Sequence, residues 1–147
     1  MKNKKKHLKN KIVRKKDDPE KDIKQFQVEI ETWKQLLNAG MEENVLLKNR
    51  ISDILKNNYD RSSLEEIEEF QTRFIGEDEL IHSLKSKIND SDSLLYNKLS
   101  EDGKTEKLLY KKMKDLRGDI TNFTTRFHLL KSAFNDFQYK ISGRREN

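Results

Sequence analysis

Residues 109–141 read LYKKMKDLRGDITNFTTRFHLLKSAFNDFQYKI, and this stretch decides the fold. Large apolar side chains recur in it in steps of three and four residues, the spacing that places them along one side of an α-helix. They fill ten heptad positions: Leu109, Met113, Leu116, Ile120, Phe123, Phe127, Leu130, Phe134, Phe137 and Ile141. Disorder is the competing interpretation of such a highly charged chain, but disordered charged chains lack a sustained apolar repeat. The stretch therefore predicts one long helix with a continuous apolar seam.

Two further seams with the same spacing lie upstream. The first runs through Ile23, Phe26, Ile30, Trp33, Leu37, Gly40, Asn44, Leu47, Ile51 and Ile54. The second runs through Ile67, Phe70, Phe74, Glu77, Ile81, Leu84, Ile88, Ser91 and Leu95, with Leu64 and Leu99 beside it. Turn-forming residues separate the three segments, so helices are predicted over about 20–58, 62–99 and 104–141.

Local signals mark where two of these helices begin. Pro19 suits the first turn of a helix, because its fixed backbone angle is already helical and its missing N–H is not needed there. Ser62 stands three residues before Glu65, and Ser63 three residues before Glu66. This capping-box arrangement satisfies free backbone amides and predicts the start of the second helix.

The connections between the predicted helices are short, and short connections make consecutive helices run in opposite directions. The sequence therefore predicts an all-α fold, an antiparallel up-down-up three-helix bundle or coiled coil, over residues 19–141. Residues 1–18 are expected to form a disordered basic tail, and residues 142–147 a frayed C-terminus. Folding about the turns pairs residue i of the first helix with roughly 121 − i of the second, and residue i of the second with roughly 203 − i of the third.

This pairing brings polar residues of the seams to one level. Asn44 is expected to face Glu77, with Arg126 of the third helix within one turn of them. Polar groups in a seam commonly fix its register, because a slipped pairing would bury them without partners. We interpret Asn44, Glu77 and Arg126 as a polar core layer; an exposed position without a role and a ligand or metal site are the alternatives. At Gly40, the missing side chain should leave room for the ring of Phe123.

Composition and spacing argue against enzyme chemistry. The chain has no Cys, which excludes thiolate ligands and thiol nucleophiles. Glu79 and His82 have the E-x-x-H spacing of di-iron bundles, but the second such motif is missing. No Ser or Thr stands in a convincing setting beside a base, and the glycines are too scattered for a phosphate-binding loop. We therefore predict no catalytic residue, no metal and no cofactor.

The net charge of +5 is unevenly distributed. Residues 1–16 contain nine cations and no acid: Lys2, Lys4, Lys5, Lys6, Lys9, Lys11, Arg14, Lys15 and Lys16. The rest of the chain has 22 basic against 26 acidic side chains. Such a tail attracts phosphate backbones or anionic lipid headgroups, although it has no aromatic residue that could stack on a base. Nucleic-acid binding, membrane attachment and a merely solvated end all stay open.

The leading hypothesis is a non-enzymatic interaction or scaffold protein that acts through protein–protein contacts. Apolar residues off the main seam would meet an unknown partner or a second copy if they are exposed, and would complete the bundle if they are covered: Leu36, Met41, Val45, Leu46 and Leu55. The alternative is a nucleic-acid-associated protein that binds the phosphate backbone through its tail. No apolar run is long enough for a transmembrane helix or a secretion signal, so a cytoplasmic location is expected.

Two segments resemble short helical bacterial proteins whose function is not assigned. They are residues 43–51, ENVLLKNRI, and residues 68–81, EEFQTRFIGEDELI. The resemblance covers roughly residues 23–141 and implies a helical coiled-coil protein, with no catalytic or binding residues to carry over. In architecture the predicted bundle also looks like a spectrin repeat, with an aromatic residue in the first helix and a heptad-rich third helix.

Overall fold

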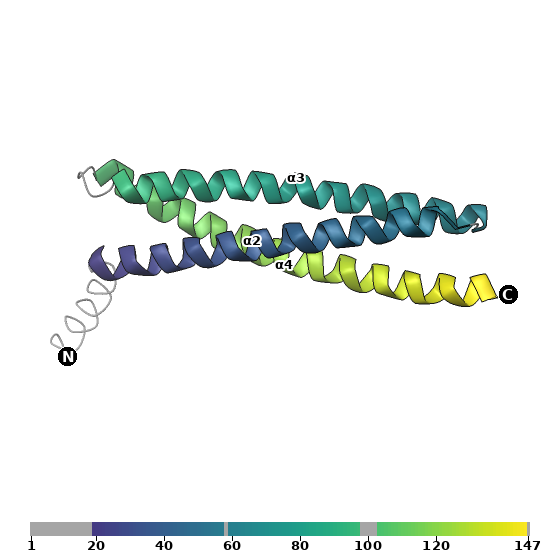
Figure 1. Ribbon diagram of the computed structural model, residues 1–147. Coiled ribbons are helices and arrows are strands. Elements are labelled where there is room, and N and C mark those ends of the chain that lie inside the picture. Colours follow the sequence, from purple (N-terminus) through teal and green to yellow (C-terminus); the bar gives the residue numbers. More distant parts are fainter. Residues whose placement is uncertain (1–18, 58, 98–102, 147) are drawn as a thin grey trace, which may run out of the picture.

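The computed structural model describes residues 19–57, 59–97 and 103–146. These residues form three long helices and no strand: α2 (Pro19–Leu55), α3 (Arg61–Asn97) and α4 (Gly103–Glu146). The prediction of an all-α chain with three helices is therefore confirmed. Figure 1 shows an elongated molecule in which the three helices lie side by side, and the start of α2 and the end of α4 lie at opposite ends.

The predicted seams make up the core of this rod. In α4 every seam residue is buried, from Leu109 at one end to Ile141 at the other. In the described parts of α2 and α3 the exceptions are Ile23, Gly40, Ile54 and Phe70, which are only partly buried. The heptad pattern identifies the core because it selects one side of each helix, and that side is where the other two helices pack.

Contacts between the helices show which levels meet. A Cβ atom at Gly40 would lie 3.4 Å from Cζ of Phe123 and 3.8 Å from Cδ1 of Ile81, so the Phe123 ring occupies the space that the glycine leaves. Lys34 of α2 contacts Asp92 of α3 at 2.9 Å. Gly40 therefore meets Ile81, and Lys34, which comes earlier in α2, meets Asp92, which comes later in α3.

The start of α3 differs from the prediction. The helix begins at Arg61, and Oδ1 of Asp60 accepts a hydrogen bond of 2.7 Å from the backbone N–H of Ser63. Asp60 is thus the N-cap, because an aspartate oxygen can reach the third free amide of the helix. The prediction that Ser62 and Ser63 cap this helix is wrong, and Ser63 lies buried in its first turn.

The helix ends also shift by a few residues. Helix α2 stops at Leu55 and α3 at Asn97, whereas α4 continues to Glu146, past the predicted end at residue 141. The hydroxyl of Ser142 donates to the carbonyl of Gln138 at 3.0 Å, a bond within the helix. No proline follows residue 141 to stop the helix. None of the described helices has an apolar stretch that could cross a lipid bilayer.

Candidate functional site

Asn44 is the most deeply buried polar residue of the predicted layer. It is fully buried, and its Nδ2 donates to the backbone carbonyl of Phe74 at 2.9 Å and to Oδ1 of Asp78 at 2.6 Å. Both donor positions of the amide group are therefore used between α2 and α3. Because the two acceptors fix the orientation of the amide, Asn44 ties one level of α2 to one level of α3.

Glu77 and Arg126 meet across α3 and α4. Nη2 of Arg126 lies 3.7 Å from Oε1 of Glu77, an ion pair longer than a hydrogen bond. Glu77 is buried, whereas Arg126 is exposed. Burial raises the pKa of Glu77, and the nearby positive charges of Arg126 and Arg73 offset part of this effect. Burial therefore disfavours the charged form of Glu77 relative to a carboxyl in water.

Sequence reasoning missed the charged partners of this layer, Lys48 and Asp78. The Lys48 ammonium donates to Oδ2 of Asp78, whose other oxygen binds Asn44. Burial opposes ionisation of Asp78, but the hydrogen bonds from Lys48 and Asn44 outweigh it and lower the pKa of this carboxyl. Both residues flank the seam, at heptad position e of their helices. Opposite charges at such flanking positions were the signal that could have found them.

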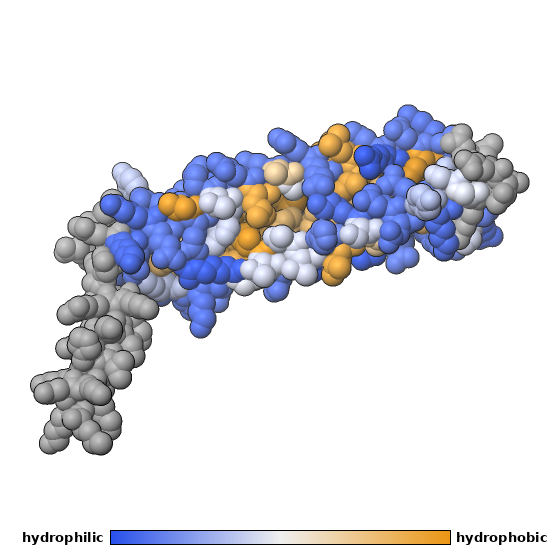
Figure 2. All heavy atoms as spheres, turned by 90° about the horizontal axis from the view of Figure 1, so that it is seen from below, coloured by the Kyte–Doolittle hydropathy of each residue, from blue (hydrophilic) through white to orange (hydrophobic). Residues whose placement is uncertain are grey.

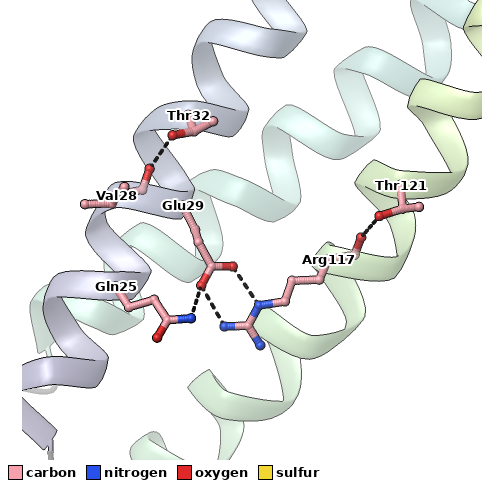
Figure 3. Close-up of polar contacts among 6 residues, drawn as sticks. All are labelled: Gln25, Val28, Glu29, Thr32, Arg117 and Thr121. Carbon is pink, nitrogen blue, oxygen red and sulfur yellow. Dashed lines mark hydrogen bonds and ion pairs between the residues drawn. The ribbon is translucent and has the colours of Figure 1, made fainter.

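A regular series of polar contacts closes the seam between α2 and α4. Asp22 accepts a hydrogen bond from the hydroxyl of Tyr110. Glu29 accepts two from the Arg117 guanidinium, at 2.6 and 2.8 Å (Figure 3). Glu43 pairs with Lys131 at 3.1 Å. Each pair is 88 residues apart, so α2 and α4 keep one register along the rod.

The Glu29–Arg117 pair makes two hydrogen bonds across this seam. Its two parallel N–H···O bonds match the planar guanidinium to the carboxylate, and they raise the pKa of Arg117 against the effect of burial. The guanidinium carbon also lies 5.5 Å from the ring centre of Phe26. Gln25 donates to the same carboxylate from the preceding turn of α2 (Figure 3). Arg117 therefore links the surface of the seam to the core.

The side between α3 and α4 is closed only in part. Its flanks carry an ion pair of 3.2 Å between Lys87 and Asp119. Hollows of about 320 Å³ and 430 Å³ open along it. Phe70 lines the first hollow, which explains why this predicted core residue is only partly buried. Both hollows are lined by charged as well as apolar side chains.

The apolar residues predicted off the seam divide into two groups. Leu36 and Met41 are partly buried and pack against the core. Val45, Leu46 and Leu55 are exposed, with 48%, 63% and 38% of their surface accessible. Because the side chains of these three residues stay exposed, they are not needed to complete the bundle.

The remaining candidates from the sequence are the cations of the N-terminal tail and the Glu79/His82 pair. The tail cations Lys2 to Lys16 lie outside the described residues. Glu79 and His82 are exposed. Within the described ranges, no group of three or more His, Cys, Asp or Glu side chains could hold a metal ion. Comparison with models of protein families, with curated proteins and with solved structures finds no match to this chain.

Proposed function

We propose that this chain is an antiparallel up-down-up three-helix bundle that works as a non-enzymatic interaction or scaffold protein. The observation that carries the proposal is the exposure of apolar side chains that the core does not use, Val45 and Leu46 on α2 above all. Exposed apolar area of this kind typically marks a contact site when the core is already complete.

The polar residues support the same proposal because they serve the bundle itself. The side-chain amide of Asn44 donates both of its hydrogen bonds to α3, and the two carboxylate oxygens of Asp78 bind Asn44 and Lys48. Glu29 and Glu43 are paired with cations of α4. Groups engaged in this way fix the spacing and register of three helices. A stiff rod with a fixed surface is what a scaffold needs.

Affinity capture with matched variants tests the proposal. Val45→Lys/Leu46→Lys should lose proteins that the unchanged chain captures, because two cations replace the exposed apolar pair. Tyr139→Lys is the control, since Tyr139 is also exposed but lies on α4. Nuclease treatment removes proteins bridged by nucleic acid. Identical captured sets from the unchanged chain and the Val45/Leu46 variant, with both folded by circular dichroism, would reject a role for this surface.

A second candidate function rests on the tail. Nine cations and no acid in residues 1–16 favour binding to phosphate backbones, while the rest of the chain is mildly acidic. Deleting residues 1–16 should abolish any gel shift of DNA or RNA at physiological salt. Retention of the shift after the deletion, or its absence from the full chain, would reject this function.

A further inference from the structure

Exposed apolar area alone does not locate a second contact site on this rod. Figure 2 shows hydrophobic areas in several places on the face that is seen from below in Figure 1, each bordered by hydrophilic residues. Where α2 meets α4, charged side chains are paired with each other, as Glu29 is with Arg117. A site for a partner is better identified by space and by polar groups that the bundle itself does not use.

Such space lies between α3 and α4, in the hollows of about 320 Å³ and 430 Å³. Arg73 lines both hollows, so they form one continuous groove, which we call the α3/α4 groove. Phe70 and Phe137 line its first part, with their ring centres 5.3 Å apart, and Glu77 lines its second part. Phe70 and Glu77 are seven residues apart on one helix, so the two parts lie one heptad, roughly 10 Å, apart.

Glu77 brings a buried oxygen without a partner to this groove. The residue is only 5% exposed, and its Oε2 has no hydrogen-bond partner among the described residues. The ion pair with Arg126 involves the other oxygen, Oε1, at 3.7 Å. A buried acceptor without a donor is unfavourable. A donor that enters the second part of the groove would therefore supply the hydrogen bond that the chain does not.

Gly76 keeps space open in the same part of the groove. It lines the second hollow together with Glu77, and a Cβ atom at Gly76 would meet nothing within 4 Å. Glycine is an unfavourable residue inside a helix, and here no neighbouring atom requires it. The missing side chain instead leaves room for a side chain from outside.

Charges along the groove favour one direction of a bound helix. The first part is lined by three acids and two cations: Glu66, Glu69, Asp136, Arg73 and Lys140. In the second part the exposed charges are those of Arg73 and Arg126. The N-terminus of a helix carries a partial positive charge and the C-terminus a partial negative one. A helix in the groove is therefore best placed with its N-terminal half on the first part.

We infer that the α3/α4 groove binds an amphipathic helix of another protein, which runs parallel to α3. An apolar side chain of that helix enters the first part, beside Phe70 and Phe137, and a glutamine or asparagine seven residues later donates to Glu77. The donor is uncharged because Arg73 and Arg126 would repel a cation. An acidic residue three positions after the apolar one lies opposite Arg73. Helices dock into grooves when their side chains follow the spacing of the groove in this way.

The inference rests on the proposed interaction function and adds a surface and a partner to it. The groove lies on α3 and α4, whereas the exposed Val45 and Leu46 lie on α2. Each surface can therefore be changed while the other stays as it is.

Binding of a designed peptide to the full chain tests the inference. The probe is a labelled, alanine-rich helix of roughly three heptads that carries a leucine, a glutamate three positions later and a glutamine seven positions later, with lysines on its opposite side. Fluorescence anisotropy should give a dissociation constant below roughly 100 μM. A control peptide with the leucine and the glutamine exchanged should bind at least roughly tenfold more weakly, because each side chain then meets the wrong part of the groove.

Two glycine variants test the place of binding. Gly76→Leu fills the second part of the groove and should weaken binding of the probe by at least roughly tenfold. Gly118→Leu is the matched control, because a Cβ atom there also meets nothing within 4 Å, but Gly118 lines neither part of the groove. Ala133→Leu, which fills the first part, replaces Gly76→Leu if that variant does not fold.

A change of polarity tests the role of Glu77. Glu77→Leu should weaken the probe and strengthen a peptide that carries leucine in place of the glutamine, each by at least roughly fivefold. A purely structural role of Glu77 would change the binding of both peptides alike, and that result would overturn the inference.

Three further results would also overturn it: no binding of the probe up to roughly 1 mM, equal binding by the Gly76→Leu chain, or equal binding of the exchanged peptide. Self-association of the chain that Gly76→Leu abolishes would assign the groove to a second copy and overturn the inferred partner. None of these results decides the capture of proteins through Val45 and Leu46, which succeeds or fails separately.

Discussion

Exchange of the small and large residues at Gly40 and Phe123 gives the sharpest test of the packing. Phe123→Ala removes a buried ring and should lower the free energy of unfolding by about 3 to 5 kcal/mol. Gly40→Leu alone adds a side chain whose Cβ already lies 3.4 Å from that ring. Overpacking of this kind costs about 1 to 3 kcal/mol, and the better helix propensity of Leu returns roughly 1 kcal/mol.

The double variant should be far more stable than the sum of these losses predicts. With the ring gone, the leucine at position 40 can extend into the space that Phe123 left, toward Ile81. We expect a coupling free energy of at least about 2 kcal/mol. Urea unfolding followed by circular dichroism measures it, provided that the dependence on urea is the same in all variants.

Gly76→Leu provides the matched control for this cycle. A Cβ atom at Gly76 would meet nothing within 4 Å, so the substitution should be neutral or slightly stabilising. It should show no coupling to Phe123→Ala. If Gly40→Leu and Phe123→Ala are additive to within about 0.5 kcal/mol, the two residues do not meet and the packing described here is wrong.

Three further predictions follow from the same structure. Burial raises the pKa of Glu77 above its ordinary 4.5, so ionisation of this carboxyl destabilises the fold as pH rises above that value. In urea unfolding, Glu77→Gln should therefore gain stability relative to the unchanged chain between acid and neutral pH. A stability difference that does not depend on pH would contradict this. The Glu29→Ala and Arg117→Ala pair should show a coupling of about 0.5 to 1 kcal/mol that shrinks at high salt, because the Arg117 side chain is 42% exposed; a coupling within error would speak against the two-bond geometry. Phe127→Ala should cost about 3 to 5 kcal/mol and His128→Ala less than about 0.5 kcal/mol in melting experiments, so similar losses would reverse the assignment of buried and exposed sides.

The core could be predicted because heptad spacing depends only on helix geometry. All ten seam positions of α4 are buried, and so are Phe26 to Leu37 of the α2 seam. Phe70 shows the limit of this reasoning. A seam position is buried only if the neighbouring helices reach it, and at Phe70 a hollow opens between α3 and α4. The spacing of residues along one helix does not contain that information.

The polar layer could be predicted only in part. The seam pattern identified Asn44 and Glu77 as two polar residues at one level among apolar ones, and the structure places Arg126 near Glu77. It did not identify Asp78, which accepts from Asn44. A side chain beside the seam can reach inward as far as one within it, so heptad position alone does not decide which of two adjacent acids meets Asn44. That choice depends on the relative rotation of α2 and α3.

The helix boundary at Asp60 was missed for a local reason. Ser62, Ser63 and Asp60 are all good capping residues, and the sequence offers them within four positions. The glutamates after the serines favoured the later start. In the structure Asp60 caps, which lets Ser63 enter the helix at a buried position. Tertiary packing of the first turn decided between caps of similar strength.

The seams alone would not fix the register of the bundle, since a slip of seven residues lays one heptad seam on another. The pairs that flank the seams remove this freedom. A slip of one heptad in either direction would place Glu43 opposite Thr124 or Gln138 instead of Lys131. The same slip would place Glu29 opposite Tyr110 or Thr124 instead of Arg117. It would also move the Phe123 ring away from Gly40. Each slip thus loses two ion pairs and the contact between the Phe123 ring and Gly40. Individually weak surface pairs therefore select the register together, in the way that flanking charges do in coiled coils.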